Sequence, residues 1–108
     1  MSLLSSLGAI FTRGGRDEAL LNQAMDHAKC KRPEKALEIY DSLLKSPALS
    51  GSLRARVLYN RGLTHSALRN EEQALTDIQE VLKLPDVPDN VQAAAKERLV
   101  RLRKRAGN

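Results

Sequence analysis

Apolar residues recur at intervals of three and four along residues 17–48 and again along residues 55–86, which is the spacing of an amphipathic α-helix. Each stretch contains two apolar stripes separated by a polar break. In the first stretch the stripes are Leu20, Ala24, His27 and Ala28, followed by Ala36, Leu37, Tyr40, Leu43 and Leu44. The break ends at Pro33, which suits the first turn of a new helix. The pattern therefore predicts two helix pairs, each joined by a short turn.

The two stretches form an internal repeat. A shift of 38 residues aligns residues 17–48 with residues 55–86, and nine of the 32 aligned pairs are identical. Ala24 and Gly62 occupy equivalent positions midway along each first helix, where closely packed helices need a small side chain. In the second unit, Asn70 is expected to cap the second helix. Repeats of this length are typical of stacked arrays of helix pairs.

The two units share a second pattern of large and small residues. It is clear at Leu58, Gly62, His65, Ala74, Leu75, Ile78, Val81 and Pro85, and weaker at Leu20, Ala24, His27, Ala36, Tyr40, Leu43 and Pro47. This pattern resembles the tetratricopeptide repeat family. The period is longer than usual, a histidine replaces the usual aromatic residue in both units, and both prolines come one residue early. The resemblance implies an all-α fold, in which antiparallel helix pairs form a right-handed superhelical array of about five helices.

Both ends of this array are expected to need cover, because two repeats are usually too few for stability. A capping helix is expected over residues 88–105, with Val91, Ala94, Ala95, Leu99 and Leu102 on its apolar face. Residues 1–15 are expected to form an amphipathic arm that ends at a glycine hinge, and residues 16–108 to form the repeat domain. The arm carries Leu3, Leu4, Leu7, Ile10 and Phe11. Three roles are open for this arm. It caps the fold or occupies its groove, it mediates self-association or partner docking, or it lies on a membrane or is disordered.

The resemblance also implies that a partner binds in a concave groove lined by the first helix of each pair. The residues expected to line this groove are Leu21, Met25, Lys29, Arg56, Tyr59, Asn60 and Leu63. Such a largely apolar lining suits an amphipathic helix or an extended apolar segment of a partner protein. Asn22 and Asn60 match the position at which chaperone-binding members hold a carboxylate tail, but the other residues of that clamp are missing. A homodimer is a further alternative, because two repeats bury little apolar surface.

The net charge of +5 belongs to the C-terminal end of the chain. Residues 96–105 contain six basic residues and one acidic residue, so the remainder is neutral. The expected basic patch consists of Arg98, Arg101, Arg103, Lys104 and Arg105. It is either a solvated helix face or a surface for an acidic protein, a nucleic acid or an anionic membrane. The lack of interleaved aromatic residues weakens the case for single-stranded nucleic acid.

Little in the sequence could support catalysis. It has no nucleophile elbow, no phosphate-binding glycine-rich loop and no paired-histidine helix motif, so we expect no enzyme activity and no cofactor. His27 and His65 are expected to fill the aromatic packing position of the repeat rather than to bind a metal. Cys30 is the only cysteine, which fits a reducing compartment. With no long apolar run and no basic leader, the chain is expected to be cytoplasmic and not membrane-bound.

Overall fold

The computed structural model describes residues 13–107, and this part of the chain forms five α-helices and no strand. The helices are α2 (Arg13–Lys29), α3 (Pro33–Leu44), α4 (Gly51–Ala67), α5 (Glu71–Lys83) and α6 (Asp89–Arg105). The expected all-α fold with about five helices is confirmed. The start of α3 at Pro33 and the break before it agree with the sequence pattern.

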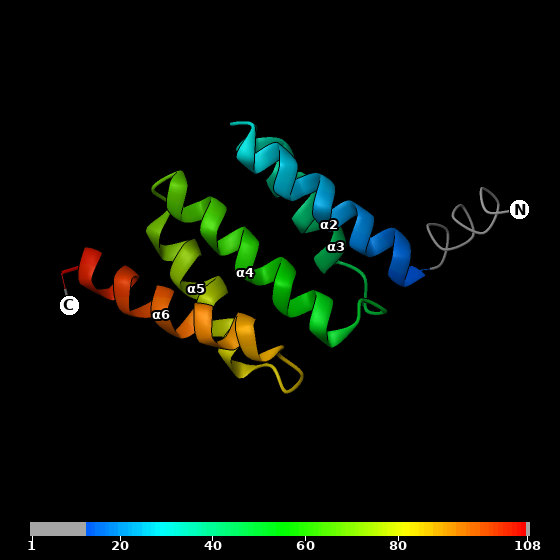
Figure 1. The fold of residues 1–108 in the computed structure, drawn as a ribbon. Helices are drawn as coiled ribbons and strands as arrows, with labels where there is room; N and C mark the ends of the chain where they lie inside the picture. The colour runs from blue at the N-terminus through cyan, green and yellow to red at the C-terminus, as the bar shows by residue number, and fades with distance from the viewer. Residues whose placement is uncertain (1–12, 108) are drawn as a thin grey trace, which may run out of the picture.

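The helices are stacked in two layers. Figure 1 shows α2, α4 and α6 side by side and running in the same direction, with α3 and α5 behind them. Each helix packs against the next one along the chain, and α4 also contacts α2 and α6. The chain therefore passes back and forth between the layers, and α4 is the central helix of the front layer.

The 38-residue period extends through all three helices of the front layer. α2, α4 and α6 end 38 positions apart, at Lys29, Ala67 and Arg105. α3 and α5 begin 38 positions apart. The helix expected near Pro88 is therefore present, and it takes the place that the first helix of a third pair would have.

Two apolar clusters form the core, one at each junction between successive units. The first lies among α2, α3 and α4 and contains Leu21, Ala24, Ala36, Tyr40, Leu43, Leu49, Leu53 and Val57. The second lies among α4, α5 and α6 and contains Leu58, Ala74, Ile78, Val81, Ala95 and Leu102. Both clusters are built largely from the stripes in the sequence, so burial of those stripes is what holds the layers together.

The turns within the two helix pairs have the same backbone geometry. Lys31 and Arg69 occupy equivalent positions and both adopt the left-handed conformation, with φ of 61° and 65°. In each turn the next residue donates its amide N–H, at 2.8 Å, to a carbonyl five positions earlier. The two bonds are Arg32 to His27 and Asn70 to His65. This is the Schellman arrangement, which satisfies carbonyl groups that a helix end leaves free.

Gly62 allows α4 and α5 to pack closely. A Cβ atom on Gly62 would lie 3.0 Å from Cδ1 of Ile78 and 3.3 Å from Cβ of Asp77. Ala24, the equivalent residue of α2, is fully buried in the first cluster. The expectation that a small residue is needed at this position is confirmed for Gly62.

An ion network that the sequence pattern did not predict joins α3, α4 and α5. Arg61 donates from Nε and Nη2 to the two carboxylate oxygens of Asp77, at 2.8 and 2.7 Å, and from Nη1 to Asp41 Oδ1 at 2.9 Å. Asp77 is only 3% exposed, and its pairing with Arg61 offsets the free-energy cost of burying the carboxylate. The hydrogen bonds with Asp77 also raise the pKa of Arg61. The equivalent residues of the first pair are Gln23 and Ile39, so the network is not repeated.

The backbone at Gly14 and Gly15 is helical. Both residues lie within α2, so the hinge expected at these glycines is wrong. The apolar residues of the expected arm, Leu3 to Phe11, lie outside the described residues. Their role therefore stays a prediction.

The side-chain cap also lies elsewhere than expected. Asn70 is at the N-cap position of α5, but its side chain makes no capping hydrogen bond. Its Nδ2 instead lies 3.4 Å from Nδ1 of His65. Ser50 caps α4, because its Oγ accepts the amide N–H of Leu53 at 3.2 Å.

Candidate functional site

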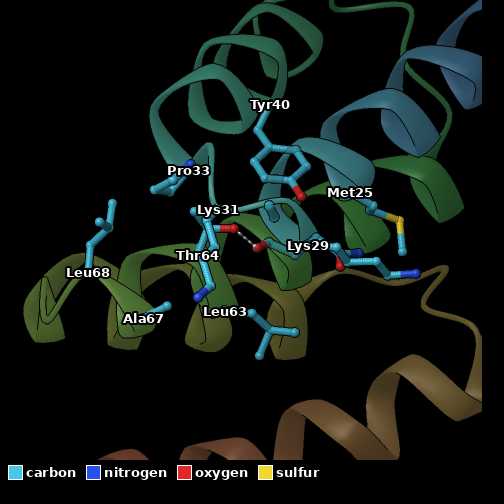
Figure 2. Close-up of a pocket in the computed structure, with 11 residues that line it drawn as sticks. Met25, Lys29, Lys31, Pro33, Tyr40, Leu63, Thr64, Ala67 and Leu68 are labelled. Carbon is cyan, nitrogen blue, oxygen red and sulfur yellow. Dashed lines mark hydrogen bonds between the residues drawn. The ribbon is translucent and has the colours of Figure 1, made fainter.

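A pocket of about 570 Å³ opens between the two helix pairs, near the C-terminal ends of α2 and α4. Figure 2 shows Leu63 and Ala67 of α4 and the following Leu68 on one side, with Pro33 and Met25 of the first pair on the other. The apolar side chains of the lining are Met25, Ala28, Pro33, Leu63, Ala67 and Leu68. Both the volume and the mainly apolar lining are typical of ligand-binding pockets.

Tyr40 and Thr64 form the most buried part of the lining, with exposures of 1% and 5%. The Thr64 hydroxyl donates to the carbonyl of Asn60 at 3.0 Å, as Figure 2 shows. Burial raises the pKa of Tyr40 above its ordinary value, and a hydrogen bond with Thr64 opposes that shift. The inner wall of the pocket is therefore uncharged at neutral pH.

The charges of the pocket are positive. Lys29 and Lys31 are lining residues, and both are exposed. Over the described part of the chain, no acidic residue lines the pocket. Cys30, between the two lysines in sequence, is also exposed. The pocket thus combines an apolar interior with two cationic side chains.

The structure brings together part of the expected groove. Met25, Lys29, Asn60 and Leu63 all line the pocket. Arg56 does not line it, and its Nη1 instead lies 3.5 Å from Oε2 of Glu18.

Two other expected groove residues belong to the packing between units. Leu21 is fully buried in the first cluster, so the expectation that it lines the groove is wrong. Tyr59, its equivalent in α4, is half-buried and packs against the second cluster. Stacking of the units covers this position, because it faces residues of the next unit.

Asn22 and Asn60, which match the carboxylate-binding position of chaperone-binding members, do not point to a carboxylate clamp in the structure. Asn60 lines the pocket, but its Nδ2 donates to the carbonyl of Arg56, one turn earlier in α4, at 2.8 Å. Asn22 is exposed on α2 and lies outside the lining. The amide group of Asn60 is therefore held on its own helix.

Sequence reasoning missed much of the pocket wall. Pro33 was recognised only as a helix start and Tyr40 only as a core residue, while Ala67 and Leu68 carried no signal of their own. The repeat did indicate this part of the wall. In stacked units, the turn within one helix pair lies beside the C-terminal end of the first helix of the next pair. The turn residues of the first pair could therefore have been assigned to the wall.

The residues of the expected basic patch do not form one continuous free surface, because some form ion pairs and others lie on different sides of α6. Arg101 donates to Oε1 of Glu97 at 2.7 Å. Arg105 pairs with Glu71. Arg103 lies five positions from the half-buried Arg98, which places it on a different side of α6. The exposed members of the patch are Arg101, Arg103, Lys104 and Arg105.

The two histidines are half-buried at the ends of α2 and α4. His27 Nδ1 accepts from Nε of Arg32 at 3.1 Å, and His65 contacts Asn70, the equivalent of Arg32. Both rings therefore support the turns that follow their helices. Within residues 13–107, no three side chains of His, Cys, Asp and Glu gather in a way that could hold a metal ion.

Comparisons of the chain with family models, curated proteins and solved structures found no match. Among the helices that the structure describes, none combines the length and apolar character needed to cross a membrane.

Proposed function

We propose that this chain is a non-catalytic interaction module of the tetratricopeptide type, which binds a segment of a partner protein in the pocket between its helix pairs. The observation that carries the proposal is the pocket itself, about 570 Å³ in volume and lined mainly by apolar side chains. An open apolar concavity with a few polar groups is the usual form of a binding site. A peptide helix or extended segment would place apolar side chains in it.

The family assignment is supported by three features of the described residues. The turns at Lys31 and Arg69 are equivalent in sequence and in backbone conformation. Gly62 occupies a close helix crossing. The first helices of successive units recur every 38 residues and lie side by side. These are the properties of a stacked helical repeat, in which each unit contacts its neighbours.

Selection from a displayed library of random peptides would test the function. We expect the recovered peptides to share apolar residues at helical or alternating spacing. Met25→Glu combined with Leu63→Glu should abolish their binding, because it places carboxylates in the apolar interior. Val100→Glu is the matched control, since Val100 is 53% exposed on α6, outside the pocket lining.

Far-UV circular dichroism would show that both variants remain helical. Recovered peptides that bind the folded double variant as tightly as the unsubstituted protein would contradict the proposal.

The alternative function, binding of a nucleic acid or another acidic surface through α6, has weaker support. Two of its arginines, Arg101 and Arg105, already pair with Glu97 and Glu71. Such binding should fall steeply with salt, because it would depend on released counterions. The absence of any mobility shift with DNA or RNA at low salt would exclude it.

A further inference from the structure

At the second junction between units, a side chain of α6 bridges α4 and α5. Arg105, near the end of α6, reaches back to α4 and α5. Its Nη1 donates to Oγ of Ser66 at 3.1 Å and lies 3.5 Å from Oε1 of Glu71. Arg105 therefore joins the end of α4 to the beginning of α5.

The same place at the first junction is open. By the 38-residue period, Ser66 and Glu71 correspond to Ala28 and Pro33, and both of these line the pocket. Arg105 corresponds to Ala67, which also lines the pocket and is exposed. The pocket is thus open where α4 has a methyl group and α6 has a long cationic side chain.

The charges at the two junctions differ, because only the second has an acidic residue at the position equivalent to Pro33. At the second junction, acidic Glu71 meets the cation of Arg105. At the first junction, Glu71 is replaced by Pro33, and the charged lining residues are Lys29 and Lys31. The neutral wall around Tyr40 adds no compensating negative charge.

We propose that the segment bound in this pocket is acidic as well as apolar, with an apolar side chain over Ala67 and Leu68 and an Asp or Glu carboxylate against Lys29 and Lys31. This inference rests on the proposed function and specifies its ligand. The charges are reversed relative to the pair of Arg105 with Glu71. At the first junction the cations, Lys29 and Lys31, belong to the wall of the pocket, and the carboxylate belongs to the ligand. The ligand is a side-chain carboxylate of a partner protein, held beside the apolar interior.

Two synthetic amphipathic peptides would test the charge preference. Both carry the same leucines at helical spacing, and the positions beside the leucines are Glu in one peptide and Lys in the other. Binding would be measured with an environment-sensitive fluorophore on Cys30, the single and exposed cysteine. We expect the Glu peptide to bind about three- to tenfold more tightly at low salt, since two exposed charge pairs contribute modestly.

Charge reversal provides the matched variant. In Lys29→Glu combined with Lys31→Glu, the preference should change to the Lys peptide. Equal affinity of the unsubstituted protein for both peptides would overturn this inference and leave the proposed function in place. If neither peptide binds and no library peptide is sensitive to Met25→Glu with Leu63→Glu, the proposed function fails and the inference fails with it.

A second variant tests the position of the ligand. Ala67→Phe puts a bulky side chain at the position where α6 has Arg105 and adds no charge that could itself attract the peptide, so it should fill the pocket and greatly weaken binding of the Glu peptide. Ala93→Phe is the control, because Ala93 is an exposed alanine of α6 that does not line the pocket. A folded Ala67→Phe protein that binds the Glu peptide with unchanged affinity would overturn the placement, and with it the inference.

Discussion

The two helix pairs have the same backbone conformation at their turns but are stabilised by different side chains. Both first helices are followed by a residue in the left-handed conformation, Lys31 or Arg69, with the same closing hydrogen bonds. In α4–α5 a buried ion pair, Arg61 with Asp77, adds to the apolar packing. The repeated positions therefore determine the path of the chain, and unrepeated positions determine how each pair is stabilised.

The two junctions between units differ in the same way. The second is bridged by Arg105, while the first is left open at Ala67. Each residue that lines the pocket differs from its counterpart 38 positions later, so side chains rather than the path of the backbone distinguish the two junctions. A pocket can therefore arise in a repeat array through side-chain differences, without any change of fold.

Removing the buried carboxylate should have the largest effect on stability. Asp77→Ala leaves the guanidinium of Arg61 without its principal partner. The expected loss of unfolding free energy is ~3 kcal/mol, at the lower end for a broken buried pair because Arg61 keeps Asp41 and some contact with solvent. Urea denaturation followed by far-UV circular dichroism would measure it.

Asp41→Ala is the control for this prediction, because it removes the exposed partner of the same arginine. The Asp41 side chain is 55% exposed, so its loss should cost less than ~1 kcal/mol. A loss for Asp41→Ala as large as that for Asp77→Ala would mean that burial does not govern the network.

Enlarging Gly62 should have the next largest effect. Gly62→Val puts methyl groups into contact with Ile78 and Asp77, and overpacking of this kind costs about 1–3 kcal/mol. Gly14→Val is the matched change in α2, where a Cβ atom meets nothing within 4 Å. It should leave the denaturation midpoint nearly unchanged.

A double variant would identify the cause of the Gly62 effect. Ile78→Ala removes the Cδ1 atom that the new side chain would meet. The combined loss for Gly62→Val with Ile78→Ala should therefore be smaller than the sum of the two single losses. Strict additivity would show that close packing of α4 on α5 is not the reason for the glycine.

Much of the fold could be predicted because helical periodicity and the internal repeat reinforce one another. The stripe around Ala36 and Tyr40 located α3, and Pro33 located its first residue. The same repeat could not place Leu21, because helical spacing puts it beside Met25 on the front of α2. Only the stacking of the next unit determines that Leu21 is buried and Met25 lines a pocket.

The remaining features depend on pairs of positions that the repeat does not preserve. Arg61 and Asp77 are 16 residues apart and have Gln23 and Ile39 as their counterparts, so alignment of the units hides them. Ala67 and Arg105 are also different residue types at equivalent positions. Charge counting predicted a basic surface on α6, but it could not show that Arg105 bridges α4 and α5.

The smallest expected change is a gain of stability at the two turns. Lys31→Gly and Arg69→Gly each remove a side chain from a left-handed backbone position, which should stabilise the fold by about 0.5–1 kcal/mol. The effects should be equal and additive, because the turns are equivalent and separate. Ala19→Gly, at an exposed position inside α2, should instead destabilise by about 1 kcal/mol. Of the two turn variants, only Lys31→Gly should weaken binding of the Glu peptide, since Lys31 lines the pocket and Arg69 does not. Opposite signs for the two turn variants in urea denaturation would disprove the equivalence of the helix pairs, whatever their effects on binding.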